Sequence, residues 1–345
     1  MTKQTVFVSG ATGFIAQHII KQLLDSNLYK VVGSVRNSVK ADKVMRDFGN
    51  NTDLTLVIVE DLSNLDAFDS VFEKHGATFD YVLHTACPIL SADNDFQKNL
   101  ITPAINGSKN IFEATVKYAP NVKKFVQTSS YAAMRNPDAN HNPNITVNEK
   151  SWGSLTLQEG LQNGWSAYFY AKTSAEREVW ALHKSLNARF LLTVINPTFV
   201  FGPQCFDSSV SKTLNSSCEI INAIVHSKPS DPPQQDIKGN FIDVRDLARA
   251  QVQCITDDKL NGQRLLLSAG KYCWQLIANI INTEFPELRG KIAKGEKGGD
   301  KQVLNSFAKI DNHVTKELLG FEFTDLETSV TDTVQQILKV EATAK

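Results

Sequence analysis

Short runs of β-branched and aromatic residues alternate with longer stretches of mixed polarity through the first two hundred residues. Such largely apolar runs are typical of strands that are buried on both faces of a sheet. They predict strands at 6–8, 30–35, 54–59, 81–84, 124–128 and 190–195. The stretches between them predict helices, most clearly at 14–25, 99–118 and 167–186. This alternation predicts an α/β fold, a doubly wound parallel sheet with helices on both faces.

The pattern changes after Pro197. Residues 203–236 predict a helix flanked by loops, and residues 240–244 predict a short strand. Further helices are expected at 275–285 and 312–319, with a surface loop rich in glycine and lysine at 290–300. A chain of 345 residues is long enough for two domains, or for one domain with a large appendage.

Composition and charge are those of an ordinary globular protein. Hydrophobic residues make up 42% and charged residues 21%, which suits a sizeable core and argues against a disordered chain. The net charge of −1 provides no field that would recruit nucleic acid or an anionic membrane, so we expect neither as a partner. There is no signal peptide and no apolar run long enough to cross a bilayer, and we therefore expect a cytoplasmic protein.

Cysteine usage argues against both a disulfide framework and a zinc site. The five cysteines are widely spaced and include no C-x-x-C pair. No cluster of His, Cys and Asp has the spacing of metal ligands, so no metal is expected.

Two glycines lie between the first strand and the first helix. Gly10 and Gly13 allow a tight turn and a close approach of the backbone to a pyrophosphate, which the N–H groups of the following helix would bind. The spacing G-x-x-G-x-x-A meets the general dinucleotide fingerprint only in part, and the alternative is a purely structural turn. The predicted cofactor-binding residues of this segment are Gly10, Ala11, Thr12, Gly13, Phe14 and Ile15.

The end of the second strand indicates which nicotinamide cofactor binds. Enzymes that use NAD place an acid there for the ribose hydroxyls, whereas this chain has Arg36 and Lys40. Arg36 can grip a 2′-phosphate through its planar fork and Lys40 can act as a point charge, so the sequence predicts NADP(H). The alternative is that both are ordinary surface cations.

Two further pairs follow the third and fourth strands. Asp61 and Leu62 lie where a side chain can reach the adenine, although Asp61 could instead be the N-cap of a helix. Thr85 and Ala86 are expected beside the phosphates and ribose of the cofactor.

The candidate catalytic group is Tyr168 with Lys172, one helical turn apart on the same face. A carbonyl that receives a hydride at carbon needs a proton at oxygen. A free phenol releases its proton only near pH ~10, and a neighbouring ammonium stabilises the phenolate form. Tyr168 is then the acid and base, and Lys172 tunes it. Ser130, at the end of the fifth strand, would donate a hydrogen bond to the reacting oxygen, while its neighbour Ser129 closes the strand in a turn.

Taken in order along the chain, these motifs resemble the extended short-chain dehydrogenase/reductases. The resemblance rests on residues 10–16, 84–88, 106–107, 128–131, 196–203 and 243–246 together with Tyr168 and Lys172. It covers nearly the whole chain and is strongest with the yeast NADPH-dependent methylglyoxal and aldehyde/ketone reductases, which are related to plant dihydroflavonol reductases.

The resemblance implies an NADP-binding Rossmann domain over residues 1–200, to which about 238–268 returns, and a smaller, mainly substrate-binding domain over 201–345. It implies that Pro197, Val200 and Ser217 approach the cofactor. It also implies a substrate pocket lined by Ile89, Ser130, Tyr131 and Phe199. Many members of the family carry an aromatic residue where this chain has Ile89, so the substrate range can differ here.

Several side chains have a simpler structural interpretation. Residues 243–246 are better explained as ion pairs that lock the two domains than as catalytic groups. His84, on an apolar strand, is expected to be a hydrogen-bonded core residue and not a base. Of the four tryptophans, only Trp165 is expected to border the site.

The main functional hypothesis is an NADPH-dependent reductase of small aldehydes and ketones, acting as a monomer or homodimer. A nucleotide-sugar epimerase or dehydratase would use the same tyrosine, lysine and glycines, but would need basic groups for a diphosphate where the pocket candidates are apolar. A cofactor-binding sensor without turnover is the alternative outside catalysis, and Tyr168 with Lys172 argues against it.

Overall fold

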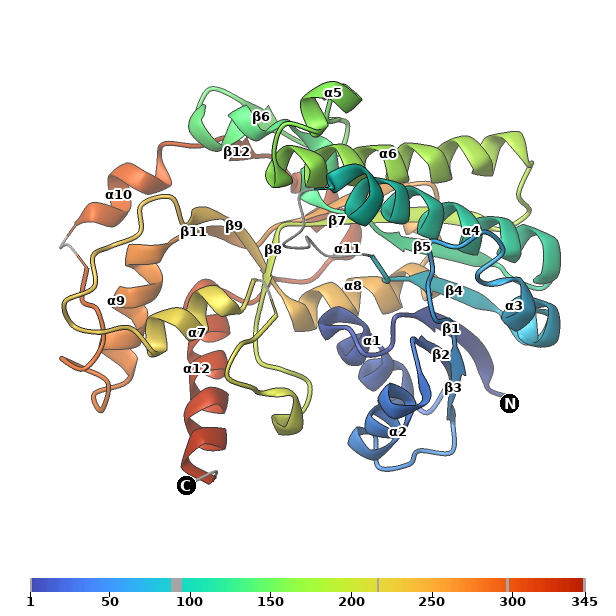
Figure 1. Ribbon diagram of the computed structural model, residues 1–345, viewed down its shortest axis with the longest axis horizontal. Helices are drawn as coiled ribbons and strands as arrows, with labels where there is room; N and C mark the ends of the chain where they lie inside the picture. The colour runs from blue at the N-terminus through green and yellow to red at the C-terminus, as the bar shows by residue number, and fades with distance from the viewer. Residues whose placement is uncertain (1, 88–94, 216, 296–297, 344–345) are drawn as a thin grey trace.

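The structure is a computed structural model that describes residues 2–87, 95–215, 217–295 and 298–343. Its centre is a parallel sheet of seven strands in the order β10-β7-β5-β4-β1-β2-β3 (Figure 1). The strands are β1 (Gln4–Ser9), β2 (Tyr29–Val35), β3 (Leu54–Ile58), β4 (Tyr81–His84), β5 (Lys124–Thr128), β7 (Leu191–Pro197) and β10 (Arg264–Leu267). The six strands predicted for the first part of the chain are all present, and the α/β class is confirmed. The order reverses between β1 and β4, where open α/β sheets bind ligands at the carboxyl ends of the strands.

Helices cover both faces of this sheet. Figure 1 shows α4 and α6 on one face and α1 and α8 on the other. The helices of this part are α1 (Phe14–Asp25), α2 (Ser38–Asp47), α3 (Asp69–His75), α4 (Thr102–Tyr118), α5 (Leu157–Gly160), α6 (Gly164–Ser185), α8 (Val244–Thr256) and α11 (His313–Leu319). The alternation within β1 shows how the sheet divides the core: Val6 and Val8 pack in the cluster of α1 and α8, and Phe7 packs in the cluster of α3 and α4.

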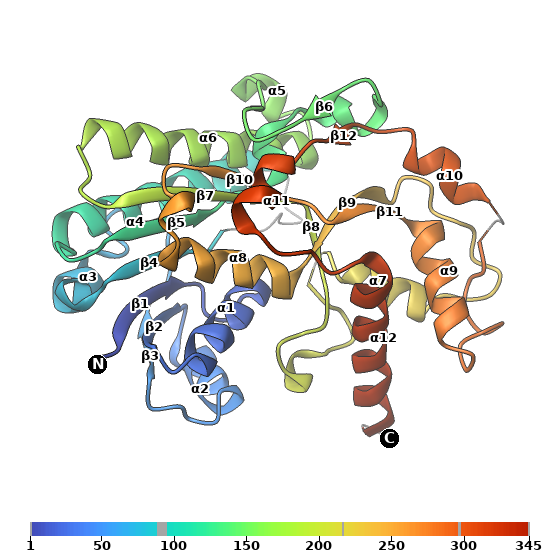
Figure 2. The ribbon, with the colours of Figure 1, turned by 180° about the vertical axis from the view of Figure 1, so that it is seen from behind.

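A smaller part of the molecule is built around a three-stranded sheet of order β11-β9-β8. Its strands are β8 (Phe199–Phe201), β9 (Lys238–Asp243) and β11 (Gly270–Cys273), and its helices are α7 (Glu219–Val225), α9 (Trp274–Glu284), α10 (Gly299–Leu304) and α12 (Leu326–Thr343). A separate cluster of buried apolar residues from α7, α9 and α12 forms its core. Seen from behind in Figure 2, this part lies beside the carboxyl ends of β5 and β7. Two short parallel strands, β6 (Thr146–Val147) and β12 (Lys309–Ile310), form a third sheet of their own.

Some elements differ from the sequence prediction. The strand predicted at 240–244 runs from Lys238 to Asp243, because Val244 begins α8. In the segment predicted to return to the large sheet, β9 joins the small sheet, while α8 and β10 pack with the large one. Of the loop predicted at 290–300, residues 290–295 lie outside helices and strands, α10 begins at Gly299, and residues 296–297 lie outside the described residues. The domain division at residue 200 stays a prediction.

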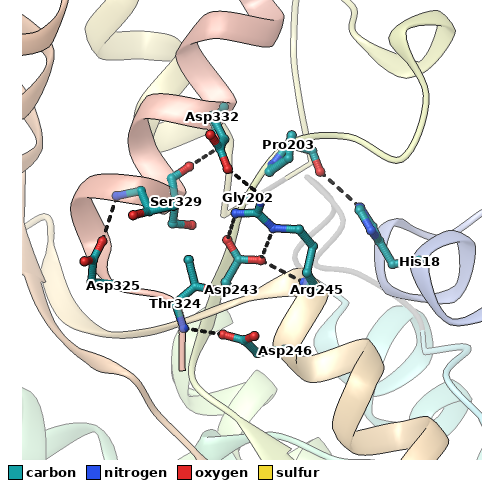
Figure 3. A network of polar contacts seen from close by, with 12 residues as sticks. His18, Gly202, Pro203, Asp243, Arg245, Asp246, Thr324, Asp325, Ser329 and Asp332 are labelled. Atoms are coloured by element: carbon teal, nitrogen blue, oxygen red, sulfur yellow. Dashed lines mark hydrogen bonds and ion pairs between the residues drawn. The ribbon is translucent and has the colours of Figure 1, made fainter. Parts of the chain in front are cut away.

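Ion pairs tie the two parts together, as Figure 3 shows. Arg245 at the start of α8 binds the fully buried carboxylate of Asp243 through two 2.8 Å contacts and reaches Asp332 of α12 at 2.5 Å. Nearby, the ring Nε2 of His18 in α1 lies 3.0 Å from the backbone oxygen of Pro203 (Figure 3). The interpretation of residues 243–246 as a lock between the two parts is therefore confirmed by their contacts.

Candidate active site

The turn between β1 and α1 has the geometry that a dinucleotide site needs. Gly10 has a φ of +72°, and a Cβ at this position would lie 3.0 Å from the Cβ of Ala86, so only glycine fits. Thr12 and Gly13 are exposed at the N-terminus of α1, which has no side-chain cap and leaves its first N–H groups open. Phe14 and Ile15 form the first turn of the helix and are half-buried.

Ala11 is buried, and its methyl group packs against Gly33 of β2, where a Cβ would come within 2.8 Å. Any contribution of Ala11 to cofactor binding must therefore come from its backbone. The buried Ser34 accepts a 3.0 Å hydrogen bond from the backbone N–H of Gly10. Gly33 and Ser34 were not predicted as site residues, although both lie in the strand beside the glycine turn.

The ends of β1 and β4 meet at the point where the strand order reverses. The Oγ of Ser9 accepts 3.0 Å hydrogen bonds from the backbone N–H groups of Thr85 and Ala86. Thr85 and Ala86 therefore lie next to the glycine turn, and their place beside the phosphates and ribose of the cofactor stays a prediction. The same Oγ lies 2.8 Å from the Nδ1 of His84, whose pKa is lowered to about 3 by burial and by the charge of Lys172. His84 is thus a hydrogen-bonded core residue, as predicted.

Arg36 and Lys40 are both exposed where β2 leads into α2. Asn37 caps this helix by accepting a 3.0 Å hydrogen bond from the N–H of Lys40. Two cations and a helix N-terminus therefore lie at the end of the strand where the 2′-phosphate was predicted.

The segment after β3 lies beside them. Hydrogen bonds from Ser63 and, to a smaller extent, the charge of Arg36 lower the pKa of Asp61. Asp61 closes a turn with Ser63 and does not begin a helix, so the alternative interpretation as an N-cap was wrong. Leu62 packs against Gly107 of α4, and Asn110 of α4 donates to its backbone oxygen at 3.0 Å.

The predicted catalytic side chains meet at the carboxyl end of β5. The phenolic oxygen of Tyr168 lies 3.4 Å from the Oγ of Ser130. That Oγ also accepts a 3.1 Å hydrogen bond from the N–H of Ala132 and so caps a short 3-10 helix (Tyr131–Met134). The turn after the strand is therefore closed by Ser130, and the prediction that Ser129 closes it was wrong, because the Ser129 hydroxyl donates to Glu176. The side chain of Tyr168 is half-buried, and Lys172 is buried one turn further along α6.

Lys172 remains a cation in this setting. Burial alone would lower the pKa of its ammonium group, but Cys87, Tyr168 and Glu176 oppose burial and raise the pKa. The Lys172 ammonium lies 5.9 Å from the centre of the Tyr168 ring, so its positive charge faces the phenol.

Glu176, one turn beyond Lys172, organises the base of the site. Its side chain is fully buried and accepts hydrogen bonds from Ser129 at 2.6 Å and Asn196 at 2.7 Å, and it pairs with Arg264 at 2.6 Å. Asn196 also donates to the backbone oxygen of Ser130 at 3.1 Å. Glu176 was not predicted as a site residue, although the i, i+4 spacing from Lys172 places the two on one face of the helix.

The remaining predicted residues come from several segments of the chain. Pro197 ends β7 and Val200 lies in β8, and both are buried. Ser217 is half-buried before α7. Phe199 is half-buried with its ring centre 5.5 Å from that of Tyr272, and Tyr131 is buried directly after Ser130. Ile89 lies outside the described residues, and Trp165, three residues before Tyr168, is 58% exposed.

The described part of the chain offers neither a metal site nor a membrane-spanning helix. No three His, Cys, Asp or Glu side chains there come together as metal ligands would. No helix there is both long and apolar enough to cross a membrane.

Comparison with known proteins places this geometry among related sequences. The model of the NAD dependent epimerase/dehydratase family matches residues 6–266. The NADPH-dependent methylglyoxal reductase GRE2 of Saccharomyces cerevisiae is 41% identical over 340 residues, which is 98% of this chain and 99% of the relative. The crystal structure of yeast methylglyoxal/isovaleraldehyde reductase Gre2 complexed with NADPH superposes with a TM-score of 0.94 at 41% identity, over 98% of this chain and 99% of that chain. Gre2 from Candida albicans in complex with NADPH gives 0.93 at 43% identity, with the same coverage.

Proposed function

Because the chain belongs to the NAD dependent epimerase/dehydratase family, we propose that it is an NADPH-dependent reductase of small aldehydes and ketones, such as 2-oxoaldehydes, diketones and aryl ketones. The observation that carries the proposal is the 3.4 Å approach of the Tyr168 phenol to the Ser130 hydroxyl, with the buried cation of Lys172 one turn away. The substrate class is supported by the methylglyoxal and methylglyoxal/isovaleraldehyde reductases that align over nearly the whole chain.

The residues at the glycine turn and the end of β2 fit the cofactor. Gly10 leaves a cradle that a Cβ would fill, and the open N–H groups of α1 face the place for a pyrophosphate. Arg36 and Lys40 would bind the 2′-phosphate, with Asp61 kept beside Arg36 on the adenine side. The bound cofactor supplies a hydride to the carbonyl carbon.

The chain's own side chains handle the proton and the developing charge. The Oγ of Ser130 accepts from Ala132, which leaves its hydrogen free to be donated to the carbonyl oxygen. Tyr168 holds its proton within reach of the same oxygen and delivers it as the alcohol forms. The positive charge of Lys172 then stabilises the phenolate that remains.

An epimerase or dehydratase would use the same groups but would give no net oxidation of the cofactor. If the chain is a reductase, we expect stoichiometric loss of NADPH with methylglyoxal, branched aldehydes, diketones and aryl ketones, measured in steady state by absorbance. NADH serves as the matched cofactor control and should support a much lower kcat/KM. If no carbonyl in the panel oxidises NADPH, the reductase proposal is wrong. Tight cofactor binding without turnover would then favour a sensor.

A further inference from the structure

The guanidinium group of Arg135 lies near two aromatic rings, and each ring belongs to a residue that directly follows a candidate catalytic residue. Its guanidinium carbon lies 4.6 Å from the ring centre of Tyr131, which directly follows Ser130. It lies 4.8 Å from the ring centre of Phe169, which directly follows Tyr168. Both distances are those of a cation–π contact, and a guanidinium donates hydrogen bonds only through the N–H groups at the edges of its plane.

Few of the N–H groups of Arg135 have a hydrogen-bond acceptor among the described residues. A guanidinium has five N–H donors, and within the described residues the hydrogen-bond acceptor of Arg135 is the backbone oxygen of Asn136, at 3.3 Å from Nη1. The Nε atom is closed off from solvent and has no acceptor among the described residues. Nor does any described carboxylate form an ion pair with Arg135, although the exposed Asp138 contributes a weaker electrostatic attraction. Burial lowers the pKa of the guanidinium, as expected for a cation without a counter-ion.

Two phenols face the same cation. The field of Arg135 acts on both Tyr131 and Tyr272, and burial raises the pKa of each phenol, so both hydroxyls stay protonated. Neither hydroxyl has a hydrogen-bond partner among the described residues. Tyr272 also packs on Phe199, which the sequence analysis placed in the substrate pocket. The Arg135 cation therefore acts on two neutral hydroxyl donors, and the two rings that it contacts belong to the residues that directly follow Ser130 and Tyr168 in the chain.

We propose that Arg135 binds a carboxylate on the substrate, so that the chain prefers oxo acids to their neutral esters. This inference rests on the proposed reductase function and names a substrate class within it. Arg135 is half-buried, and its Nε is closed off from solvent. A cation that is partly removed from water without a counter-ion is costly, and an anionic substrate would reduce that cost when it binds. The planar fork of arginine matches both oxygens of a carboxylate, and Tyr131 and Tyr272 can donate to the same group.

The test uses paired substrates that differ only in charge. Steady-state NADPH oxidation is measured with phenylglyoxylate and 4-oxopentanoate and with the ethyl ester of each, which varies the spacing between carbonyl and carboxylate. For the better-placed pair, the acid is expected to exceed its ester in kcat/KM by about tenfold. Arg135→Met should lower kcat/KM for that acid by about thirtyfold, mainly through KM, and change the ester by less than about threefold. Arg135→Lys, which keeps the charge and loses the fork, should fall between the two.

Arg177 provides a matched control on α6. Its guanidinium also lies over a ring, that of Trp152 at 5.3 Å, and donates to a backbone oxygen, that of Gly153 at 3.0 Å, but the side chain is exposed. Arg177→Met should leave the ratio of acid to ester unchanged. Thermal unfolding and NADPH titration of each variant separate a lost fold from a lost contact. If Arg135→Met does not fold, the ratio of acid to ester activity in Arg135→Lys is compared with that of the wild type instead.

Three results would overturn the inference. Esters reduced as well as their acids by the wild type would overturn it while leaving the reductase proposal intact, as would an equal loss of acid and ester activity in Arg135→Met. A wild type that oxidises NADPH with neither acids, esters nor methylglyoxal would overturn the reductase proposal and this inference with it.

Discussion

The hydroxyl of Ser129 donates a 2.6 Å hydrogen bond to the buried carboxylate of Glu176, while the hydroxyl of Ser130 lies 3.4 Å from the Tyr168 phenol. Two adjacent serines at the end of β5 therefore have different surroundings. One side chain is held in the protein interior, and the other faces the half-buried tyrosine. This difference separates a structural serine from the one proposed to touch substrate.

The two serines should respond differently to removal of their hydroxyls. Ser130→Ala removes the proposed donor to the carbonyl oxygen and should lower kcat by about two orders of magnitude with little loss of stability. Ser129→Ala removes a hydrogen bond to a buried charge and should cost ~1.5–3 kcal/mol of unfolding free energy with a smaller effect on kcat. Steady-state kinetics and urea unfolding of both variants check this. If Ser129→Ala is the slower enzyme, the assignment is reversed.

Glu176 should support both the fold and the charge of Lys172. Glu176→Gln leaves the nearly buried guanidinium of Arg264 without its carboxylate, and should cost ~3–5 kcal/mol in urea unfolding. Since Glu176 helps to raise the pKa of Lys172, its loss should lower that pKa and move the alkaline limb of the kcat/KM profile to lower pH. Glu178→Gln, on the same helix, is the control. An unmoved alkaline limb in Glu176→Gln would show that Glu176 acts on stability alone.

Arg36 should discriminate between the two nicotinamide cofactors. Arg36→Asp replaces a proposed phosphate ligand by a repelling charge, and should raise KM for NADPH by one to two orders of magnitude because a charge-assisted hydrogen bond is worth ~1.5–3 kcal/mol. KM for NADH should change little. Lys30→Asp makes the same change of charge near the other end of β2 and should spare both cofactors. Equal loss of NADPH and NADH binding in Arg36→Asp would contradict the assignment.

The buried histidines should make the protein less stable in acid. The pKa of His84 falls from 6.5 to about 3 and that of His18 to about 4, so between these values and pH 6.5 the unfolded chain binds protons that the folded chain does not. Their contribution is therefore complete above pH 6.5 and is lost as the pH falls. His84→Asn, which can keep a hydrogen bond to Ser9, should flatten the dependence of the unfolding free energy on pH by up to one proton. Parallel curves for the wild type and the variant would refute this, and the exposed His141→Asn is the control.

Much of the large sheet could be predicted because its strands are short, apolar and separated by helices. The glycine turn after β1 was predictable for a related reason, since Gly10 needs a backbone conformation that other residues avoid. The i, i+4 spacing of Tyr168 and Lys172, together with the serines at the end of the fifth predicted strand, indicated which side chains meet at the carboxyl end of β5, and their catalytic role stays a prediction. The strand β10 was harder, because four residues, Arg264–Leu267, carry too little pattern to be distinguished from a loop.

The missed features depend on contacts between distant segments. Glu176 acquires its role from Ser129, Asn196 and Arg264, which only the folded sheet brings to one point. Arg135 looks like any surface cation in the sequence, and only the rings of Tyr131 and Phe169 reveal where it lies. The N-cap interpretation of Asp61 failed for a local reason, because the carboxylate closes a turn with Ser63 before any helix begins.

The most direct test of the proposed chemistry is Tyr168→Phe, assayed for NADPH oxidation with methylglyoxal and for NADPH affinity by fluorescence titration. The change removes one oxygen, which is the proposed proton donor 3.4 Å from Ser130. We predict that turnover falls by about two to four orders of magnitude while the Kd for NADPH stays within about twofold of the wild type. A variant that keeps the wild-type rate would contradict the assignment of Tyr168 as the acid.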